Sequence, residues 1–183
     1  LQGADATDEL TVLSRAIAQH RLPNVSEALA SADALIEMRP DDPYYHELRG
    51  QILLESGRAQ EAAASYRRAS ELAPHEPLIL AGLGRALLNT SDANVLEEAR
   101  DALKKSTRRD RANTGALRDL ALAEARLGND GMAALATAER YLVEGEVSDA
   151  RRNAQRAYDL LPAGSPGWRR SQDLLSMTGK SRK

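Results

Sequence analysis

The chain has 183 residues and a formal net charge of −2, so its overall charge does not favour nucleic-acid binding. It contains no cysteine, which excludes disulfide bonds and thiolate chemistry, and no apolar run approaches the roughly 18–20 residues of a membrane span. Alanine-rich stretches without glycine or proline, and without alternating β-branched residues, predict an all-α protein.

Helices and short turns alternate along the whole chain. Pro40, Pro74 and Pro162 mark helix ends, because proline cannot continue a helix interior. Ser165 and Pro166 are typical of the cap and first turn of a helix. Residues 177–183 are expected to be a disordered tail. The predicted helices span residues 6–20, 25–38, 43–56, 59–72, 77–89, 94–107, 114–127, 131–143, 147–161 and 165–176.

Residues 43–76 are the clearest repeating unit, with a helix, a tight turn at residues 56–58 and a second helix. Gly50 and Ala62 lie 12 residues apart and predict the point where the two helices cross closely. Tyr66 supplies an aromatic residue one helical turn later. This order of small, large and aromatic residues resembles the tetratricopeptide repeat, whose helix pairs bury their apolar faces by stacking.

The spacing of the small residues defines the array. The first small residue of each unit is Ala16, Gly50, Gly84, Ala121 or Ala138, with steps of 34, 34, 37 and 17 residues. The last step is half a repeat, so one helix serves two units. We therefore predict an all-α, right-handed superhelix of antiparallel helix pairs. It forms a single array over residues 1–176, with repeats at about 9–42, 43–76, 77–113 and 114–164, a shared helix at 131–143 and a capping helix at 165–176.

Three stretches show a more specific resemblance: residues 41–58, 128–168 and 171–175. The half-repeat helix followed by Pro-Ala-Gly-Ser-Pro-Gly-Trp at 162–168 is the most distinctive part. Together they resemble the C-terminal tetratricopeptide region of bacterial periplasmic zinc metalloproteases of the β-barrel assembly-enhancing type. The resemblance implies a periplasmic location, a preceding zinc protease domain, and recruitment of outer-membrane barrel proteins or their assembly factors.

The sequence offers no catalytic constellation. His46 and Glu47 begin like the zinc motif HExxH, but Gly50 stands where the second histidine is needed. His20, His46 and His75 lie in different repeats without a matching cluster of carboxylates, so no metal or other cofactor is expected. His46 is expected beside the groove or in packing, and the other two at the surface. The chain itself is not expected to be an enzyme.

Residues 104–111 hold the densest run of basic side chains. Cations at the C-terminal end of a helix suit the helix dipole, which favours a solvated helix end. A weak contact with an anionic partner is the alternative interpretation.

A concave groove is the predicted binding site, because the first helices of stacked repeats line such a surface. The second, fifth, ninth, twelfth and thirteenth repeat positions face the groove, and Leu10, Tyr44 and Leu78 share the second position. The mixture of apolar and basic side chains predicts a protein or peptide ligand with apolar and acidic groups. The predicted groove residues are Tyr44, Glu47, Gln51, Leu54, Arg85, Asn89, Arg118, Leu122 and Arg126.

The leading hypothesis is a protein-interaction module, namely the recruiting region of a periplasmic metalloprotease-like protein. Glu47 and Gln51 stand where a clamp for chaperone carboxylates needs other residues, which disfavours that ligand. Two alternatives stay open. The chain could regulate a linked zinc protease domain by packing on it, or it could self-associate through an apolar edge near Leu10–Ile17. Neither nucleic acid nor a membrane span is expected.

Overall fold

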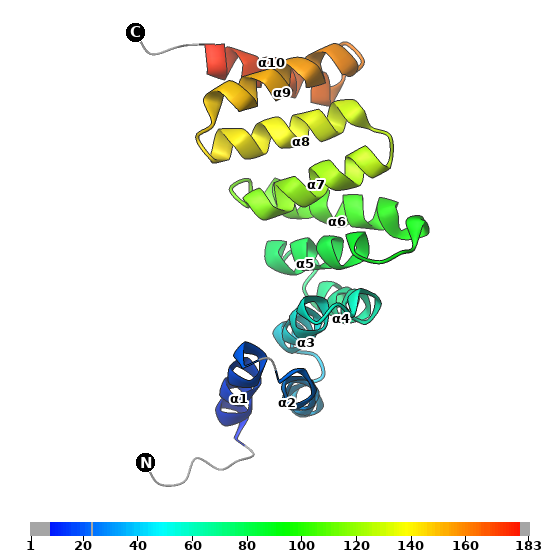
Figure 1. Ribbon diagram of the computed structural model, residues 1–183, viewed down its shortest axis with the longest axis vertical. Helices are drawn as coiled ribbons and strands as arrows, with labels where there is room; N and C mark the ends of the chain where they lie inside the picture. The colour runs from blue at the N-terminus through cyan, green and yellow to red at the C-terminus, as the bar shows by residue number, and fades with distance from the viewer. Residues whose placement is uncertain (1–7, 23, 180–183) are drawn as a thin grey trace. The chain divides into compact units, whose positions relative to one another are not determined.

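The computed structural model describes residues 8–22 and 24–179, and within these residues it contains only helices and turns (Figure 1). The residues divide into two compact units, Leu1–Thr90 and Ser91–Lys183. The first unit contains α1 (Glu9–Arg21), α2 (Val25–Met38), α3 (Pro43–Glu55), α4 (Ala59–Leu72) and α5 (Pro77–Leu88). The second contains the short η1 (Ala93–Val95), α6 (Leu96–Arg109), α7 (Thr114–Arg126), α8 (Asp130–Val143), α9 (Val147–Leu160) and α10 (Pro166–Gly179).

The helix ends lie within three residues of those predicted from the sequence. Helix α1 begins at Glu9 because the Asp8 side chain accepts a hydrogen bond from the Thr11 amide, 3.4 Å away. The predicted helical residues 6 and 7 lie outside the described part of the chain. Helix α10 continues through residues 177–179, which were expected in the tail, and residues 180–183 lie outside the described part.

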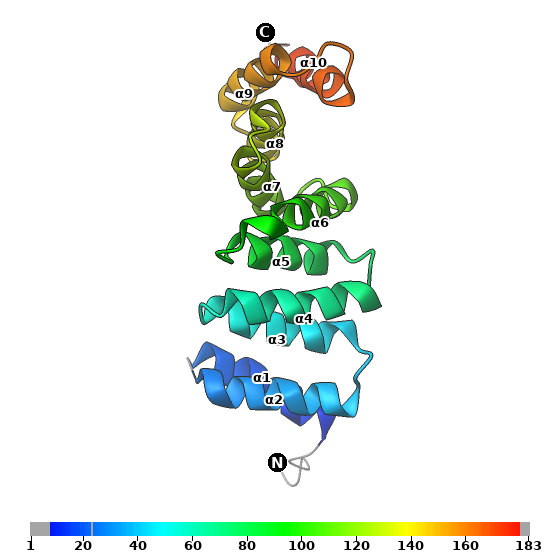
Figure 2. The ribbon, with the colours of Figure 1, turned by 90° about the vertical axis from the view of Figure 1, so that its right-hand side faces the viewer.

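In the first unit, α1 pairs with α2 and α3 pairs with α4, while α5 packs on α4 and also contacts α3 (Figures 1 and 2). Buried residues on α1, α2 and α3 form the contact between the first two pairs, including Ala16, Leu35, Tyr45 and Ile52. Gly57 has a φ of 79°, a conformation that favours glycine and allows the tight turn between α3 and α4.

Tyr66 fills the space between α3, α4 and α5. A Cβ atom on Gly50 would lie 2.8 Å from Tyr66 Cδ2, and a Cβ atom on Gly82 would lie 2.2 Å from Tyr66 Cε1. The ring is therefore held between two glycines of neighbouring helices. The sequence had predicted Gly50 against Ala62. Although Ala62 is fully buried, the three atoms nearest a Cβ at Gly50 all belong to Tyr66.

In the second unit, each helix from α6 to α10 packs against the next one. Helix α8 contacts both α7 and α9, and α10 also contacts α8. Small residues allow this close packing, with Ala138, Ala154 and Ala157 fully buried around Leu174. A single array through both units stays a prediction.

A buried carboxylate connects three elements of the second unit. The Glu124 side chain on α7 is 1% exposed. Lys104 Nζ on α6 lies 2.9 Å from Glu124 Oε1, and Asn129 Nδ2 donates a 2.8 Å hydrogen bond to Oε2. A charge this deeply buried needs such partners, because its desolvation is costly. Lys104, predicted as part of a solvated helix end, thus neutralises a buried acid.

Candidate partner-binding surface

The predicted groove residues of α3 share one face of that helix, since they are spaced three or four residues apart. Tyr44 and Gln51 are exposed, and Glu47 and Leu54 are half-buried. On α5, Arg85 is half-buried and Asn89, at the helix end, is exposed. Each of these six side chains is therefore at least partly accessible from solvent.

Three large apolar side chains are exposed at equivalent places in the first unit. Leu10, Tyr44 and Leu78 lie 34 residues apart and are 71%, 56% and 58% exposed. Single exposed apolar side chains are normal in soluble proteins. The repetition at one position of α1, α3 and α5 is different, because it presents such a group on every second helix of the unit. We call these three residues the apolar row.

Glu47 is the half-buried acidic group of this face. It has no hydrogen-bond or ion-pair partner within residues 8–22 and 24–179. Burial and then the nearby Glu76 raise the pKa of the Glu47 carboxyl above its usual value. Burial, reinforced by Glu47 and opposed by Arg85, raises the pKa of Tyr66 to about 12. A carboxylate that is partly accessible, partly desolvated and unpaired is a candidate binding position.

A polar network borders this face between α1 and α3. His20 Nε2 lies 2.8 Å from Glu55 Oε2, and Gln51 donates a 2.9 Å hydrogen bond to Glu55 Oε1. His20 was predicted at the surface, whereas its side chain is only 17% exposed in this contact. His46 Nε2 lies 2.8 Å from the Pro40 carbonyl oxygen, which is consistent with a packing role.

The predicted groove residues of the second unit lie along one face of α7. Arg118, Leu122 and Arg126 are all exposed, and Leu122 is 43% exposed. Arg118 Nη2 donates a 3.1 Å hydrogen bond to the carboxylate of Asp119, which is nearly buried. Arg118 therefore has a structural contact in addition to its exposure. That the residues of the two units form one groove stays a prediction.

The described residues contain no cluster of three or more His, Cys, Asp or Glu side chains that could hold a metal ion. None of the described helices combines the length and the apolar character that crossing a membrane requires.

A comparison with sequence profiles of protein families and one with solved structures bear on the fold. Residues 13–77 and 48–95 match the sequence profile of the tetratricopeptide repeat. The chain has the tetratricopeptide-repeat fold. The predicted all-α class is thereby confirmed, and this fold supports a protein–protein interaction module. No curated protein sequence matches the chain significantly.

Solved structures share this fold at low sequence identity. A MamA crystal structure gives a TM-score of 0.71 at 14% identity, covering 96% of this chain and 87% of MamA. YrrB, described as a tetratricopeptide-repeat protein with an unusual peptide-binding site, gives 0.67 at 15% identity, covering 82% and 76%. PilF of Pseudomonas aeruginosa gives 0.59 at 14% identity, covering 93% and 88%. At these identities the similarity shows the fold alone.

Proposed function

We propose that the chain is a recruiting module that binds a partner protein through the apolar row and Glu47 of its first unit. The exposure of Leu10, Tyr44 and Leu78 at one repeat position is the observation that carries this proposal. Fully burying a side chain of this size is worth about 1.5–3 kcal/mol. A partner that covers two or three of them therefore gains enough free energy to offset part of the cost of association.

The chemistry of the partner follows from the charges beside the row. Glu47 has no cation near enough to pair with it among the described residues. A partner that donates a hydrogen bond or a positive charge to Glu47 would offset the cost of its desolvation. The sequence suggested an acidic partner from the arginines of the predicted groove. Because Arg118 already contacts Asp119, that argument is weaker for α7. We infer a partner segment with apolar side chains next to a lysine, an arginine or free backbone amides.

We further propose that the partner is an outer-membrane barrel protein or one of its assembly factors, met in the periplasm as part of a metalloprotease-like protein. The support is the resemblance of residues 162–168 to that family. In the structure, this motif forms the turn that leads into α10. Gly164 has a φ of 78°, the Ser165 hydroxyl accepts a 3.2 Å hydrogen bond from the Trp168 amide, and Trp168 stacks on Tyr158 with ring centroids 4.8 Å apart.

Affinity capture from a bacterial envelope extract tests the proposal. The purified chain should enrich outer-membrane barrel proteins or their assembly factors, identified by mass spectrometry. The variant Tyr44→Ser/Leu78→Ser should lose them, because it removes two members of the apolar row. The matched control is Leu160→Ser/Met177→Ser, which removes side chains that are 51% and 58% exposed elsewhere. The control should capture as much as the wild type.

Other outcomes distinguish the alternatives. Equal capture by both variants would contradict a role for the row. If the wild type captured none of these proteins but sedimented as a dimer that Tyr44→Ser/Leu78→Ser dissociated, the row would serve self-association. If instead the row bound a purified zinc protease domain of the resembling family, the regulatory alternative would replace recruitment.

A further inference from the structure

A pocket of about 490 Å³ opens within the second unit, away from the apolar row. Its walls come from α6 and the segment after it, from α7 and α8, and from the start of α10. Leu117, Leu142 and Val143 supply apolar lining, and Arg108 and Arg111 supply positive charge. The volume falls in the range of about 300–1,000 Å³ that is typical of ligand pockets.

The helices around α8 form the hollow. Helix α8 contacts α7, α9 and α10, and α7 contacts α6. Figure 2 shows α6 and α10 on the same side of α7 and α8. The pocket lies between these two flanking helices, with Leu117 of α7 and Leu142 of α8 in its lining.

The pocket carries an excess of positive charge. Arg108 and Arg111 have no hydrogen-bond or ion-pair partner in the part of the chain that the structure describes. Asp110, between them in sequence, accepts a 3.0 Å hydrogen bond from the Ala112 amide. Arg170 Nε is paired with Glu139 Oε1 at 2.7 Å, so the third arginine of the lining is neutralised.

The helix dipole accounts for only part of this arrangement. Arg108 lies in the last turn of α6, where a cation is favourable. Arg111 lies beyond the C-cap residue Asp110, outside the helix. Two unpaired guanidinium groups beside an apolar lining are therefore complementary to a ligand that has both anionic and apolar groups.

We propose that this pocket binds an acidic peptide segment in which carboxylate side chains alternate with aliphatic ones. The planar guanidinium group suits a carboxylate, because it donates two parallel hydrogen bonds. The aliphatic side chains of the segment contact Leu117, Leu142 and Val143. Single-stranded nucleic acid is a poorer match, because its binding relies on aromatic stacking and the pocket lining contains no aromatic residue. This site does not depend on the surface proposed for the first unit.

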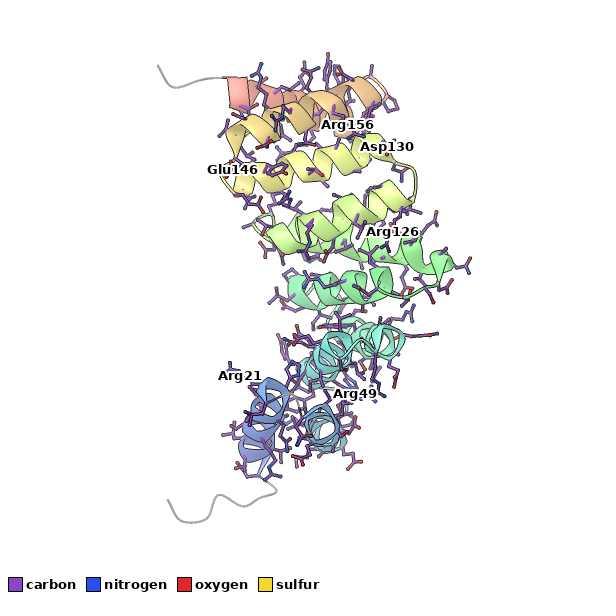
Figure 3. The ribbon with its side chains drawn as sticks, viewed as in Figure 1. Arg21, Arg49, Arg126, Asp130, Glu146 and Arg156 are labelled. Atoms are coloured by element: carbon purple, nitrogen blue, oxygen red, sulfur yellow. The ribbon has the colours of Figure 1, made fainter. Side chains whose placement is uncertain are left out.

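Isothermal titration calorimetry on the full chain tests the proposal with an N-acetylated octapeptide of alternating Asp and Leu. The analogue with Asn in place of Asp is the matched probe. Arg108→Gln/Arg111→Gln should weaken binding of the acidic peptide about tenfold or more, the loss expected when charge-assisted hydrogen bonds are removed. Lys105→Gln/Arg156→Gln, which removes the same charge from exposed residues outside the lining (Figure 3 labels Arg156), should leave the affinity unchanged.

A second variant examines the apolar lining. Val143 is 44% exposed, so Val143→Glu should fold, which circular dichroism checks, and should weaken the acidic peptide by charge repulsion. The proposal is overturned if the acidic peptide does not bind, if the Asn analogue binds equally well, or if the control variant loses as much affinity as the pocket variant. Tighter binding of a single-stranded oligonucleotide that displaces the peptide would overturn it as well.

Discussion

Replacing Gly82 by alanine tests the contact that organises the first unit. The new Cβ atom would lie 2.2 Å from Cε1 and 2.5 Å from Cζ of Tyr66, well inside van der Waals contact. The ring cannot simply move away, because Gly50 closes its other side, with a Cβ position there only 2.8 Å from Cδ2.

The magnitude follows from two opposing terms. Overpacking a well-filled core costs about 1–3 kcal/mol. Alanine in a helix interior is favoured over glycine by about 1 kcal/mol. The difference between the two terms is about 0–2 kcal/mol, so we expect Gly82→Ala to lower the free energy of unfolding by up to about 2 kcal/mol in spite of its better helix propensity.

Urea unfolding followed by far-UV circular dichroism measures the change. The decisive comparison uses a Tyr66→Val background, which removes the ring atoms that the new methyl group meets. There Gly82→Ala should become neutral or stabilising, by up to about 1 kcal/mol. Gly179→Ala is a control, because only the tip of the Arg151 side chain lies within 3 Å of its Cβ position. If Gly82→Ala stabilised the protein with Tyr66 present, the packing argument would be refuted.

Two further changes probe charged groups. Burial and Glu76 raise the pKa of Glu47 in the folded state, so its contribution to stability is greatest at low pH and is lost as the pH rises through its folded pKa. In urea titrations, the free energy of unfolding of Glu47→Gln should therefore rise relative to that of the wild type as the pH increases above about 4, where an ordinary glutamate begins to ionise. A difference that shrinks with rising pH would contradict the sign of the pKa shift. Lys104→Met should cost about 2–4 kcal/mol by leaving Glu124 buried without its cation, and adding Glu124→Gln should recover most of the loss. If the stability changes of Lys104→Met and Glu124→Gln simply added in the double variant, the two side chains would not be coupled.

Much of the fold could be predicted from the sequence, because residues with known preferences for helix ends mark the helix boundaries. Pro74 and Pro162 lie just after α4 and α9, and Pro43, Pro77 and Pro166 occupy the first helical position of α3, α5 and α10. The residue that packs against Gly50 could not be predicted in this way. Ala62 and Tyr66 share a face of α4, being four residues apart, so small-residue spacing alone could not tell which of them fills the space.

Helix α10 extends to Gly179, beyond the end predicted from the sequence. Thr178 is nearly buried, and its hydroxyl donates a 2.7 Å hydrogen bond to the Leu174 carbonyl oxygen. Leu174 itself is fully buried in the core with α8 and α9. Thr178 is thus a nearly buried helical residue, whereas composition alone assigned residues 177–179 to a tail.

Some features of the candidate sites could likewise be predicted from the sequence, and others could not. Exposure of Tyr44 and Leu78 follows from repeat position and could be predicted. The contact of Arg118 with Asp119 could not, because neighbouring residues of a helix do not normally face each other. The pocket of the second unit was missed because its residues come from four helices and no sequence spacing brings them together. The only sign of the pocket in the sequence was the basic run at residues 104–111, for which a weak contact with an anionic partner was the alternative interpretation.

Site-specific photo-crosslinking in living bacteria tests the central claim most directly. A photoreactive phenylalanine derivative replaces Tyr44 or Leu78 in the apolar row, and Leu160 or Met177 as exposed controls. The account predicts that positions 44 and 78 crosslink to the same outer-membrane barrel protein or assembly factor, and that positions 160 and 177 do not. Equal crosslinking at all four positions, or none at positions 44 and 78, would contradict the apolar row as the recruiting surface.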